Sequence, residues 1–494
     1  AAAAKTTTAD TLNHFSILVA DNVNAIIGSL EVNSVAMSQV GLFVLNCNLA
    51  NNLNHIWSLQ IWNSSFTGIN LTQGLITINS DGYKHQALDN LTVWIQNTTF
   101  ENIDWSTNTG GILTSTTSLI GKSQGSEYAI TITNCTFKDL KGTQGLIYGG
   151  VESEFNYILW LDNSTFNSLE VSGGGALINP TSSLLSSTST INVLRSDISY
   201  KMTNCEVTNV EAQDGAVFYW KSLSRGVSIL FENSFFENIA SSQNGGVFSG
   251  SFGVSTSSQI LLERSIVTIN FKNSSAKNIS AQNGAVIYSG ITAEVLNLTL
   301  NNCSIEDISS TQNGGVMYMF ASNVGSASTT LRLLQSTSTT VGNVTVSNSN
   351  FSSITTENGA LIYDSTPNKT LSISLQASTF QFLSSTLRGG VLYLTQPLFL
   401  AQGNTFINCS AGLSGQVIYS LSGDINMNDF NASNMIVNIT SLSDFAPTNL
   451  KIEFIPLDNS ETSLSLENYQ NFSTNPIVPN LTSYSLSEYS IRLT

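Results

Sequence analysis

The stretch Asn302-Cys303-Ser304-Ile305-Glu306-Asp307-Ile308, followed by Gly314-Gly315-Val316-Met317-Tyr318, decides the fold because it recurs along most of the chain. It returns as Asn233-Ser-Phe-Phe-Glu-Asn-Ile239 with Gly245-Gly-Val-Phe248, and as Asn273-Ser-Ser-Ala-Lys-Asn-Ile279 with Gly284-Ala-Val-Ile-Tyr288. Further copies begin at Asn63, Asn97, Asn134, Asn163, Asn204 and Asn348. Repeated units of this kind stack on their neighbours to bury a continuous core, so the sequence predicts a solenoid.

Alignment of the copies gives two apolar columns. The first lies three residues after the leading asparagine and holds Phe66, Phe100, Phe137, Phe166, Val207, Phe236, Ala276, Ile305, Phe351 and Phe380. The second lies three residues further on and holds Ile69, Ile103, Leu140, Leu169, Val210, Ile239, Ile279, Ile308, Ile354 and Leu383. Residues before the asparagine alternate, as in Leu296-Asn-Leu-Thr-Leu300, which is the period of a strand with one buried face. We expect an all-β fold with both columns facing inward.

The spacing of the copies indicates the kind of solenoid. From Asn134 onward the intervals are 29, 41, 29, 40, 29, 46 and 29 residues. Three short strands and three turns need about 22 to 30 residues, so the short interval fits one coil of a single-stranded parallel β-helix of about 11 to 13 coils. The longer coils carry insertions rich in Ser and Thr, such as residues 181–190 and 251–258. We expect these to be solvated loops that line up on one side of the rod.

The pairing of Phe-x-Asn with Gly-Gly-Val/Ala-x-Tyr resembles the repeats of the polymorphic outer membrane proteins and of related giant surface proteins of protists. Those repeats are similar to the pectin-lyase-like β-helices, so the resemblance implies a right-handed coil. It covers roughly residues 30 to 430. This scaffold hosts enzymes, adhesins and structural rods, so the resemblance implies a fold without selecting one function.

Three segments follow from the extent of the repeat. Residues 1–32 are predicted to be an N-terminal cap or first coil, and residues 33–439 the parallel β-helix. Residues 440–494 lack the repeat and hold Pro447, Pro456, Pro476 and Pro479, four of the seven prolines. We expect this non-repeating, β-rich segment to be a C-terminal cap, a set of donated strands or the start of a second β module.

Composition excludes several partners. The net charge is -16, and charged residues are only 10% of the chain. An acidic protein does not bind nucleic acid or an anionic membrane through electrostatics, so neither is expected as a partner. The sequence has no run of 18 apolar residues, and no membrane span is predicted.

Eighteen Asn-x-Ser/Thr sequons indicate an N-glycosylated protein, located outside the cell or on its surface. The predicted glycosylation sites are Asn63, Asn70, Asn90, Asn97, Asn134, Asn163, Asn273, Asn278, Asn297, Asn302, Asn343, Asn350, Asn368, Asn408, Asn431, Asn438, Asn471 and Asn480. Occupancy is expected mainly in turns and loops, such as those around Asn343 and Asn368. For the leading asparagines the alternative is an inward ladder of stacked amides, which would be inaccessible to a sugar.

The cysteines and histidines do not form a metal-binding pattern. Cys135, Cys205 and Cys303 each follow a leading asparagine, and their coils are two or more layers apart. That separation exceeds the reach of a disulfide, about 7 Å between Cα atoms, so these residues, with Cys47 and Cys409, are expected to be free, buried thiols. His14, His55 and His85 all precede the regular repeat. No metal or cofactor site is predicted.

Catalysis of polysaccharide cleavage would need carboxylates that converge on one face. Asp162, Asp214 and Glu232 are the only set that we expect to approach across layers, and a solvated surface is the favoured interpretation for them. A column of tyrosines, Tyr219, Tyr288, Tyr318, Tyr363, Tyr393 and Tyr419, is interpreted as stabilising stacking in preference to a sugar platform. No catalytic residue is predicted.

Together these features predict a non-enzymatic extracellular structural glycoprotein, a subunit of a surface filament, appendage or coat. Self-association is expected to be end to end, because the terminal strands of a β-helix carry unpaired backbone groups. Two alternatives remain. One is an adhesin that binds a partner or glycan through its aligned loops, and the other is a polysaccharide lyase or hydrolase on the same fold.

Overall fold

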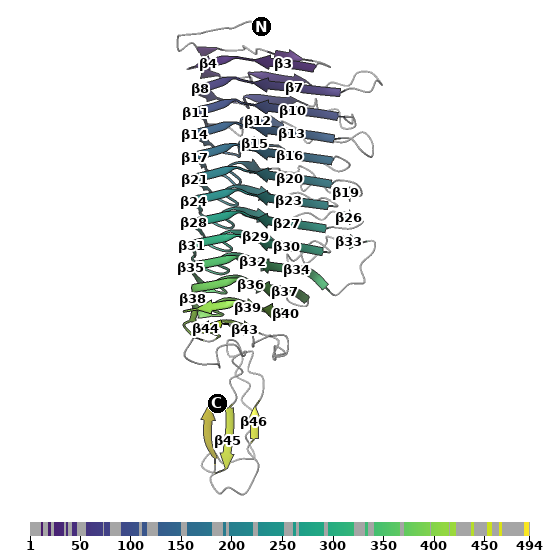
Figure 1. Cartoon of the computed structure of the whole chain (residues 1–494). Helices are drawn as coiled ribbons and strands as arrows, with labels where there is room; N and C mark the ends of the chain where they lie inside the picture. Colours follow the sequence, from purple (N-terminus) through teal and green to yellow (C-terminus); the bar gives the residue numbers. More distant parts are fainter. Residues whose placement is uncertain are drawn as a thin grey trace.

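The body of the computed structural model consists of three long parallel β-sheets around one core (Figure 1). The sheets arise because successive coils of the chain stack on one another. The structure describes residues 11–12, 18–20, 24–33, 36–37, 42–46, 56–72, 74–79, 90–107, 111–115, 127–149, 156–179, 191–193, 197–220, 226–250, 260–262, 266–290, 295–320, 331–333, 340–365, 370–395, 397–413, 415–420, 436–438, 452–456, 464–466 and 489–493.

Sheet I contains 12 strands, which supply the first strand of each coil. They are β3 (Asn24–Gly28), β7 (Ile56–Trp62), β10 (Asn90–Gln96), β13 (Glu127–Thr133), β16 (Asn156–Asp162), β20 (Asp197–Thr203), β23 (Gly226–Glu232), β27 (Ile266–Lys272), β30 (Val295–Asn301), β34 (Thr340–Ser347), β37 (Thr370–Gln376) and β40 (Pro397–Gln402).

The strands of sheet II follow the leading asparagines along the chain. The sheet contains 16 strands, because in some coils this strand is divided into two shorter ones. They are β1 (Thr11–Leu12), β4 (Glu31–Asn33), β5 (Ala36–Met37), β8 (Ser65–Leu71), β11 (Thr99–Trp105), β14 (Thr136–Gly142), β17 (Thr165–Val171), β21 (Glu206–Ala212), β24 (Phe235–Ser241), β28 (Ser275–Ala281), β31 (Ser304–Ser310), β35 (Asn350–Asn358), β38 (Thr379–Arg388), β41 (Thr405–Ile407), β42 (Ser410–Ala411) and β44 (Ile436–Asn438).

Sheet III follows the glycine turn and contains 13 shorter strands. They are β2 (Leu18–Ala20), β6 (Phe43–Asn46), β9 (Ile76–Asn79), β12 (Leu113–Ser115), β15 (Ile147–Tyr148), β18 (Ile178–Asn179), β22 (Phe218–Trp220), β25 (Phe248–Gly250), β29 (Ile287–Gly290), β32 (Met317–Phe320), β36 (Ile362–Ser365), β39 (Leu392–Leu394) and β43 (Ile418–Ser420). Each strand pairs in parallel with its counterpart in the next coil, which confirms the predicted single-stranded parallel β-helix.

The two apolar columns face inward, as predicted. Every member of both columns is at most 3% exposed. Because identical residues recur at the same register, Phe66, Phe100, Phe137 and Phe166 stack along the axis with centroid separations of 5.2, 4.8 and 4.8 Å. Offset stacks of this kind contribute beyond the area that they bury, so the column stabilises each coil against the next.

Apart from the glycine turn, two positions in each coil lie in the left-handed region and bend the chain. The leading asparagine is one, with φ near 50° from Asn63 to Asn348, and Ala377 and Gly403 hold the same conformation where asparagine is replaced. The other lies five residues later within sheet II, at residues such as Asn238 (φ 55°) and Asn278 (φ 51°). Asparagine tolerates this region better than other residues with a Cβ, which explains why it recurs.

The glycine turn holds a further left-handed position. The repeat predicts a turn column of Gly215, Gly246, Gly284, Gly315, Gly359, Gly390 and Gly415, which is wrong by one residue at Gly246, Gly315 and Gly390. The left-handed residues are Gly215, Gly245, Gly284, Gly314, Gly359, Gly389 and Gly415. In the pairs that begin at Gly245, Gly314 and Gly389 the first glycine makes the turn, and an added Cβ there would lie 2.1 to 2.3 Å from a carbonyl oxygen of the same turn.

The insertions align, as predicted, and part of each forms a strand. β19 (Ile191–Val193), β26 (Ile260–Leu262) and β33 (Leu331–Leu333) pair in parallel as a separate sheet, beside the coils in Figure 1. The stretches 181–190 and 251–258, predicted as solvated loops, lie outside the described residues.

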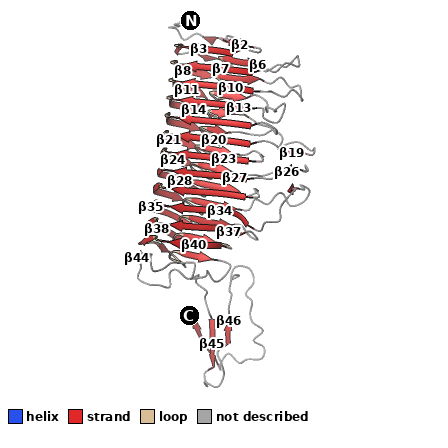
Figure 2. Cartoon of the chain, turned by 45° about the vertical axis from the view of Figure 1, so that its right-hand side comes forward, coloured by secondary structure: helices blue, strands red, loops and turns tan. Residues whose placement is uncertain are grey.

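The non-repeating segment has a different pattern of pairing. β45 (Ile452–Pro456) pairs antiparallel with both β46 (Leu464–Leu466) and β47 (Tyr489–Leu493). The boundaries at residues 32 and 439 stay predictions. The described residues hold strands and turns without a helix, as Figure 2 shows, and so none that is long and apolar enough to cross a membrane.

Candidate functional site

The leading asparagines form a ladder on the outside of the rod. In six of them the side-chain amide Nδ2 donates a hydrogen bond to a side-chain oxygen one coil earlier. The pairs run from Asn97 to Asn63, Asn163 to Asn134, Asn204 to Asp162, Asn233 to Asn204, Asn273 to Asn233 and Asn302 to Asn273, at 2.6 to 3.3 Å. The sequence left two interpretations for these residues, accessible glycosylation sites or an inward ladder. The ladder forms, but its side chains are exposed. The left-handed φ turns Cβ outward, and the following residue enters the core instead.

This orientation bears directly on the predicted glycosylation sites. The described sequon side chains that are exposed belong to Asn63, Asn70, Asn97, Asn134, Asn163, Asn273, Asn278, Asn302, Asn343, Asn350 and Asn408, and that of Asn297 is half-buried. Asn90 and Asn438 lie in strands β10 and β44, and Asn368, Asn431, Asn471 and Asn480 lie outside the described residues. Asn343, expected in a turn or loop, instead lies within strand β34 and donates to Asn297 at 3.0 Å.

A second ladder runs inside the rod, directly after the leading asparagine. Ser234 Oγ accepts a hydrogen bond from the backbone N–H of Cys205 at 3.3 Å and donates to the carbonyl of Glu232 at 3.0 Å. Ser274 Oγ accepts from Ser234 N–H at 3.2 Å in the same way. Three positions of this ladder are occupied by Cys135, Cys205 and Cys303. Their thiols therefore take part in the hydrogen bonding of the ladder as well as in core packing.

The prediction of free, buried thiols is confirmed for Cys135, Cys205, Cys303 and Cys409. Burial raises the pKa of Cys135 to about 11 and that of Cys205 to about 12, although hydrogen bonding with the backbone opposes the shift. Thiols held protonated in this way are unreactive. Cys47 lies outside the described residues, as do His14, His55 and His85.

The three carboxylates considered for catalysis do not converge. Asp162 and Glu232 lie in one column of sheet I, two coils apart, with Thr203 between them. Asp162 accepts from Thr203 Oγ1 and Asn204 Nδ2, and Glu232 pairs with Lys272 at 2.6 Å. Asp214 lies at the glycine turn, where it accepts from Asn244 Nδ2 at 3.1 Å. Each carboxylate is engaged in a ladder or ion pair of its own.

The predicted tyrosine column forms an axial stack over five coils. Tyr288, Tyr318, Tyr363, Tyr393 and Tyr419 have centroid separations of 5.2, 5.1, 4.6 and 5.2 Å. Tyr219 lies in the same column but is separated from Tyr288 by Ser249. Burial is the main cause that raises the pKa of Tyr288 to about 12. The five rings from Tyr288 to Tyr419 stack on one another along the axis, which fits the stacking interpretation.

Exposed tryptophans are concentrated on the outer face of sheet I. Trp62, Trp94 and Trp160 are 45, 41 and 39% exposed. Trp94 and Trp160 share one column, with Thr131 between them. Trp160 is fixed by β20, because its Nε1 donates to Thr203 Oγ1 at 3.1 Å and Lys201 Nζ lies 5.1 Å from its ring centroid.

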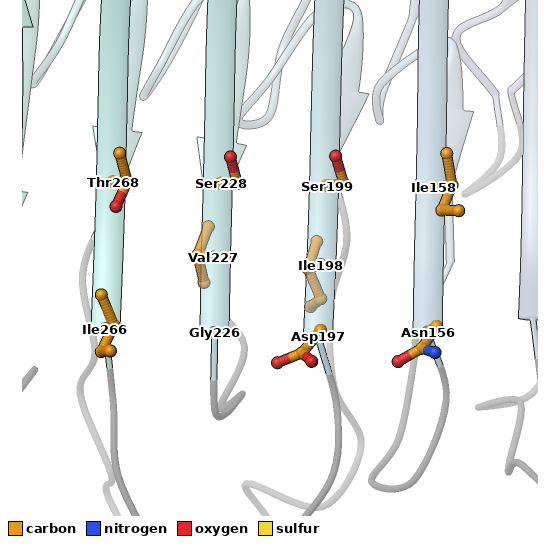
Figure 3. Close-up of a pocket in the computed structure, with 10 residues that line it drawn as sticks. All are labelled: Asn156, Ile158, Asp197, Ile198, Ser199, Gly226, Val227, Ser228, Ile266 and Thr268. Carbon is orange, nitrogen blue, oxygen red and sulfur yellow. The ribbon is translucent and has the colours of Figure 1, made fainter. Parts of the chain in front are cut away.

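A groove of about 410 Å³ begins two residues from Trp160 along the same strand. It crosses the first residues of β16, β20, β23 and β27, and Figure 3 shows its lining side chains on four adjacent strands. Its lining residues are Asn156, Ile158, Asp197, Ile198, Ser199, Gly226, Val227, Ser228, Ile266 and Thr268. Gly226 leaves space for the Asp197 carboxylate, since a Cβ there would lie 2.7 Å from Asp197 Oδ1.

Sequence reasoning missed this face, although a signal was present. Trp94 and Trp160 occupy outward positions of the alternating strands that precede the leading asparagines, where polar residues are usual. Alignment of those strands would have placed the two tryptophans in one column. The groove itself was not predictable, because it depends on which small residues meet across four coils.

Among the described residues, no group of three or more His, Cys, Asp or Glu side chains is placed to hold a metal ion. Comparison of the chain with protein-family models, with curated proteins and with solved structures gives no match. The resemblance to polymorphic outer membrane protein repeats stays a prediction.

Proposed function

We propose that the chain is a non-enzymatic structural glycoprotein of the extracellular space or cell surface, a rod that serves as a subunit of a filament, appendage or coat. The observation that carries this proposal is the outward ladder of sequon asparagines. Asn63, Asn97, Asn134 and Asn163 present amides to solvent on four successive coils. An acceptor amide must be accessible, and a surface with few charges gains hydration from sugars.

The test is a peptide map of the native chain before and after enzymatic removal of N-glycans. Removal converts a glycosylated asparagine to aspartate, so a mass increase is expected at sequons such as Asn134 and Asn302. The ladder supplies internal controls, because Asn204 and Asn233 share the same column and exposure but lack the sequon. Unmodified sequons throughout, or an equal increase at Asn204 and Asn233, would refute the proposal.

Assembly end to end is the second part of the proposal. Within the described part of the chain, the three parallel sheets end at β1, β2 and β3 on one side and at β40, β43 and β44 on the other. Strand edges without a partner pair with a cap or with another chain. The antiparallel pairing of β45 with β46 and β47 favours a small module of its own over strands donated to a neighbour.

Adhesion is the second candidate function, favoured by the small sheet of β19, β26 and β33. Aligned insertions that pair with one another form a continuous surface element, which a partner can contact at several coils at once. Loss of binding to cells or to a glycan array after shortening of these insertions would support adhesion. The separate positions of Asp162, Asp214 and Glu232 give a lyase or hydrolase less support.

A further inference from the structure

The groove on sheet I is a trough with a floor of small side chains. Ile158, Ser199, Ser228 and Thr268 occupy the same register on β16, β20, β23 and β27. Adjacent strands are about 4.8 Å apart, so the floor extends about 14 Å along the rod axis. Three of the four floor side chains carry a hydroxyl, and the row repeats at the spacing of the coils.

Bulkier columns border this floor on both sides. Two residues further along the strands lies the column of Trp160, Lys201 and Leu230. On the other side lie Asn156, Asp197 and Ile266, and the Asp197 carboxylate extends toward the space left by Gly226 (Figure 3). The trough is therefore open along the axis and limited across it, which is the shape needed for an extended chain.

Trp160 lies beside the trough, two residues from its floor along β16, and is not one of its ten lining residues. Its ring is 39% exposed, yet its Nε1 is fixed by Thr203 Oγ1 and its position by Lys201. A ring fixed before binding loses little conformational entropy when a ligand contacts it. Trp94, two coils away in the same column, is 41% exposed and extends the aromatic row beyond the trough.

The chemistry of these side chains matches a sugar polymer. The C–H faces of a pyranose pack on an indole ring, and its hydroxyls pair with Ser, Thr, Asn and carboxylate groups. Asp197 and Lys201 are the charged residues of the trough and its border, and they are opposite in sign. With a chain net charge of -16, this balance disfavours a polyanion.

We propose that the sheet I trough, together with the neighbouring exposed ring of Trp160, binds a linear neutral polysaccharide along the rod axis. This binding site is distinct from the ladder that carries the proposed glycans, so either proposal can hold without the other. The polymer lies across successive strands, and each coil contributes an equivalent position for part of a sugar unit.

Titration of the full chain with neutral hexasaccharides tests this site. The probes are β-linked hexamers of glucose, xylose, mannose and N-acetylglucosamine, followed by calorimetry and by tryptophan fluorescence. At least one hexamer is expected to bind and to change the fluorescence. Trp160→Ala should lower the affinity for that hexamer about tenfold or more, and Trp160→Phe should retain part of the affinity. Ser228→Phe should block binding by filling the floor.

Phe382→Ala is the matched control, because Phe382 is 51% exposed but lies on sheet II. It should leave the affinity unchanged, and circular dichroism should show the same fold for all variants. The proposal is overturned if no neutral hexamer binds, or if Trp160→Ala and Ser228→Phe both bind like the wild type. Binding of polygalacturonate that exceeds that of every neutral hexamer would also overturn it.

Discussion

Phe236 shows how one side chain supports several coils. It is fully buried and meets Phe231 and Phe271 with centroid separations of 5.4 and 6.3 Å. Phe236→Ala should lower the free energy of unfolding by about 3 to 5 kcal/mol, because the cavity adds to the lost transfer energy. Urea unfolding measures this loss. Phe382→Ala removes an exposed ring and should cost far less, and a loss below ~1 kcal/mol for Phe236→Ala would contradict the inward packing.

The hydroxyl group of Tyr200 is expected to contribute nothing favourable to the stability of the core. Its OH is buried without a hydrogen-bond partner, while its ring packs on Phe218 and Trp220 at 4.6 and 5.7 Å. Tyr200→Phe keeps the ring and removes an unsatisfied group, so stability should stay equal or rise by about 1 to 2 kcal/mol. Ser234→Ala is the contrasting variant, since Ser234 Oγ has partners on both sides and its loss should destabilise. A clear loss for Tyr200→Phe would reveal a partner for that hydroxyl.

The buried thiols make the protein sensitive to alkali. The pKa of Cys205 is raised from 9.0 to about 12 by burial, so the unfolded chain loses this proton at lower pH than the folded chain does. The unfolded state then binds fewer protons, and stability should fall between pH 9 and about 12, by about 1.4 kcal/mol per pH unit at most.

Cys205→Ser tests this contribution because serine fills the same ladder position in neighbouring coils. Unfolding in urea at pH 7.5 and at pH 10.5 should show a smaller alkaline loss for the variant than for the wild type. Equal losses would mean that the Cys205 thiol does not titrate differently on unfolding.

Among the elements, the outer asparagine ladder is the one whose contribution can be isolated. Asn233 donates to Asn204 at 3.3 Å, accepts from Asn273 at 3.2 Å, and has φ 51°. Asn233→Ala should cost about 1 to 3 kcal/mol, because it loses both bonds and places alanine in a strained conformation. Asn233→Gly loses the two side-chain hydrogen bonds but avoids the conformational strain, so it should lower the free energy of unfolding less than Asn233→Ala does.

Asn233 is suited to this comparison because it is followed by Ser-Phe and carries no sequon. Thermal unfolding of the three proteins separates conformational strain from amide bonding without interference from glycans. If Asn233→Ala and Asn233→Gly were equally stable, the left-handed conformation would not explain the recurrence of asparagine.

The strands and their inward faces could be predicted from sequence because the period of two and the repeat of 29 residues fix both. The direction of the leading asparagine, left open between an accessible glycosylation site and an inward ladder, could not be predicted for a physical reason. A residue in the left-handed region reverses the alternation, so its side chain faces outward although its neighbours suggest otherwise. The predicted glycine column was wrong by one residue at the Gly-Gly pairs, because the sequence does not show which of the two glycines adopts the left-handed conformation.

The trough on sheet I was beyond prediction for a different reason. Its floor joins Ile158, Ser199, Ser228 and Thr268, whose separations in sequence vary with the insertions between the coils. Only the three-dimensional register brings them into one row. Trp160 was predictable as an outward residue, but its fixation by Thr203 and Lys201 was not.

At the scale of the whole molecule, the proposal of end-to-end assembly can be tested by truncation. Removal of residues 441–494 leaves strands β1 to β44 intact. If the last segment links neighbouring rods, light scattering should show polymers for the full chain and monomers for the truncated one. A full-length chain that stays monomeric at high concentration would instead favour a rod tethered singly to a surface.

The small sheet of β19, β26 and β33 gives the rod a mechanical direction. Its strands come from every second coil, so their attachment points are about 9.6 Å apart, whereas paired strands are about 4.8 Å apart. The backbone pairing of this small sheet therefore connects coils that are not neighbours. Bending that opens this side would separate β19 and β33 from β26, and bending the other way would not. We therefore expect the rod to resist bending that opens this side more than bending in the opposite direction.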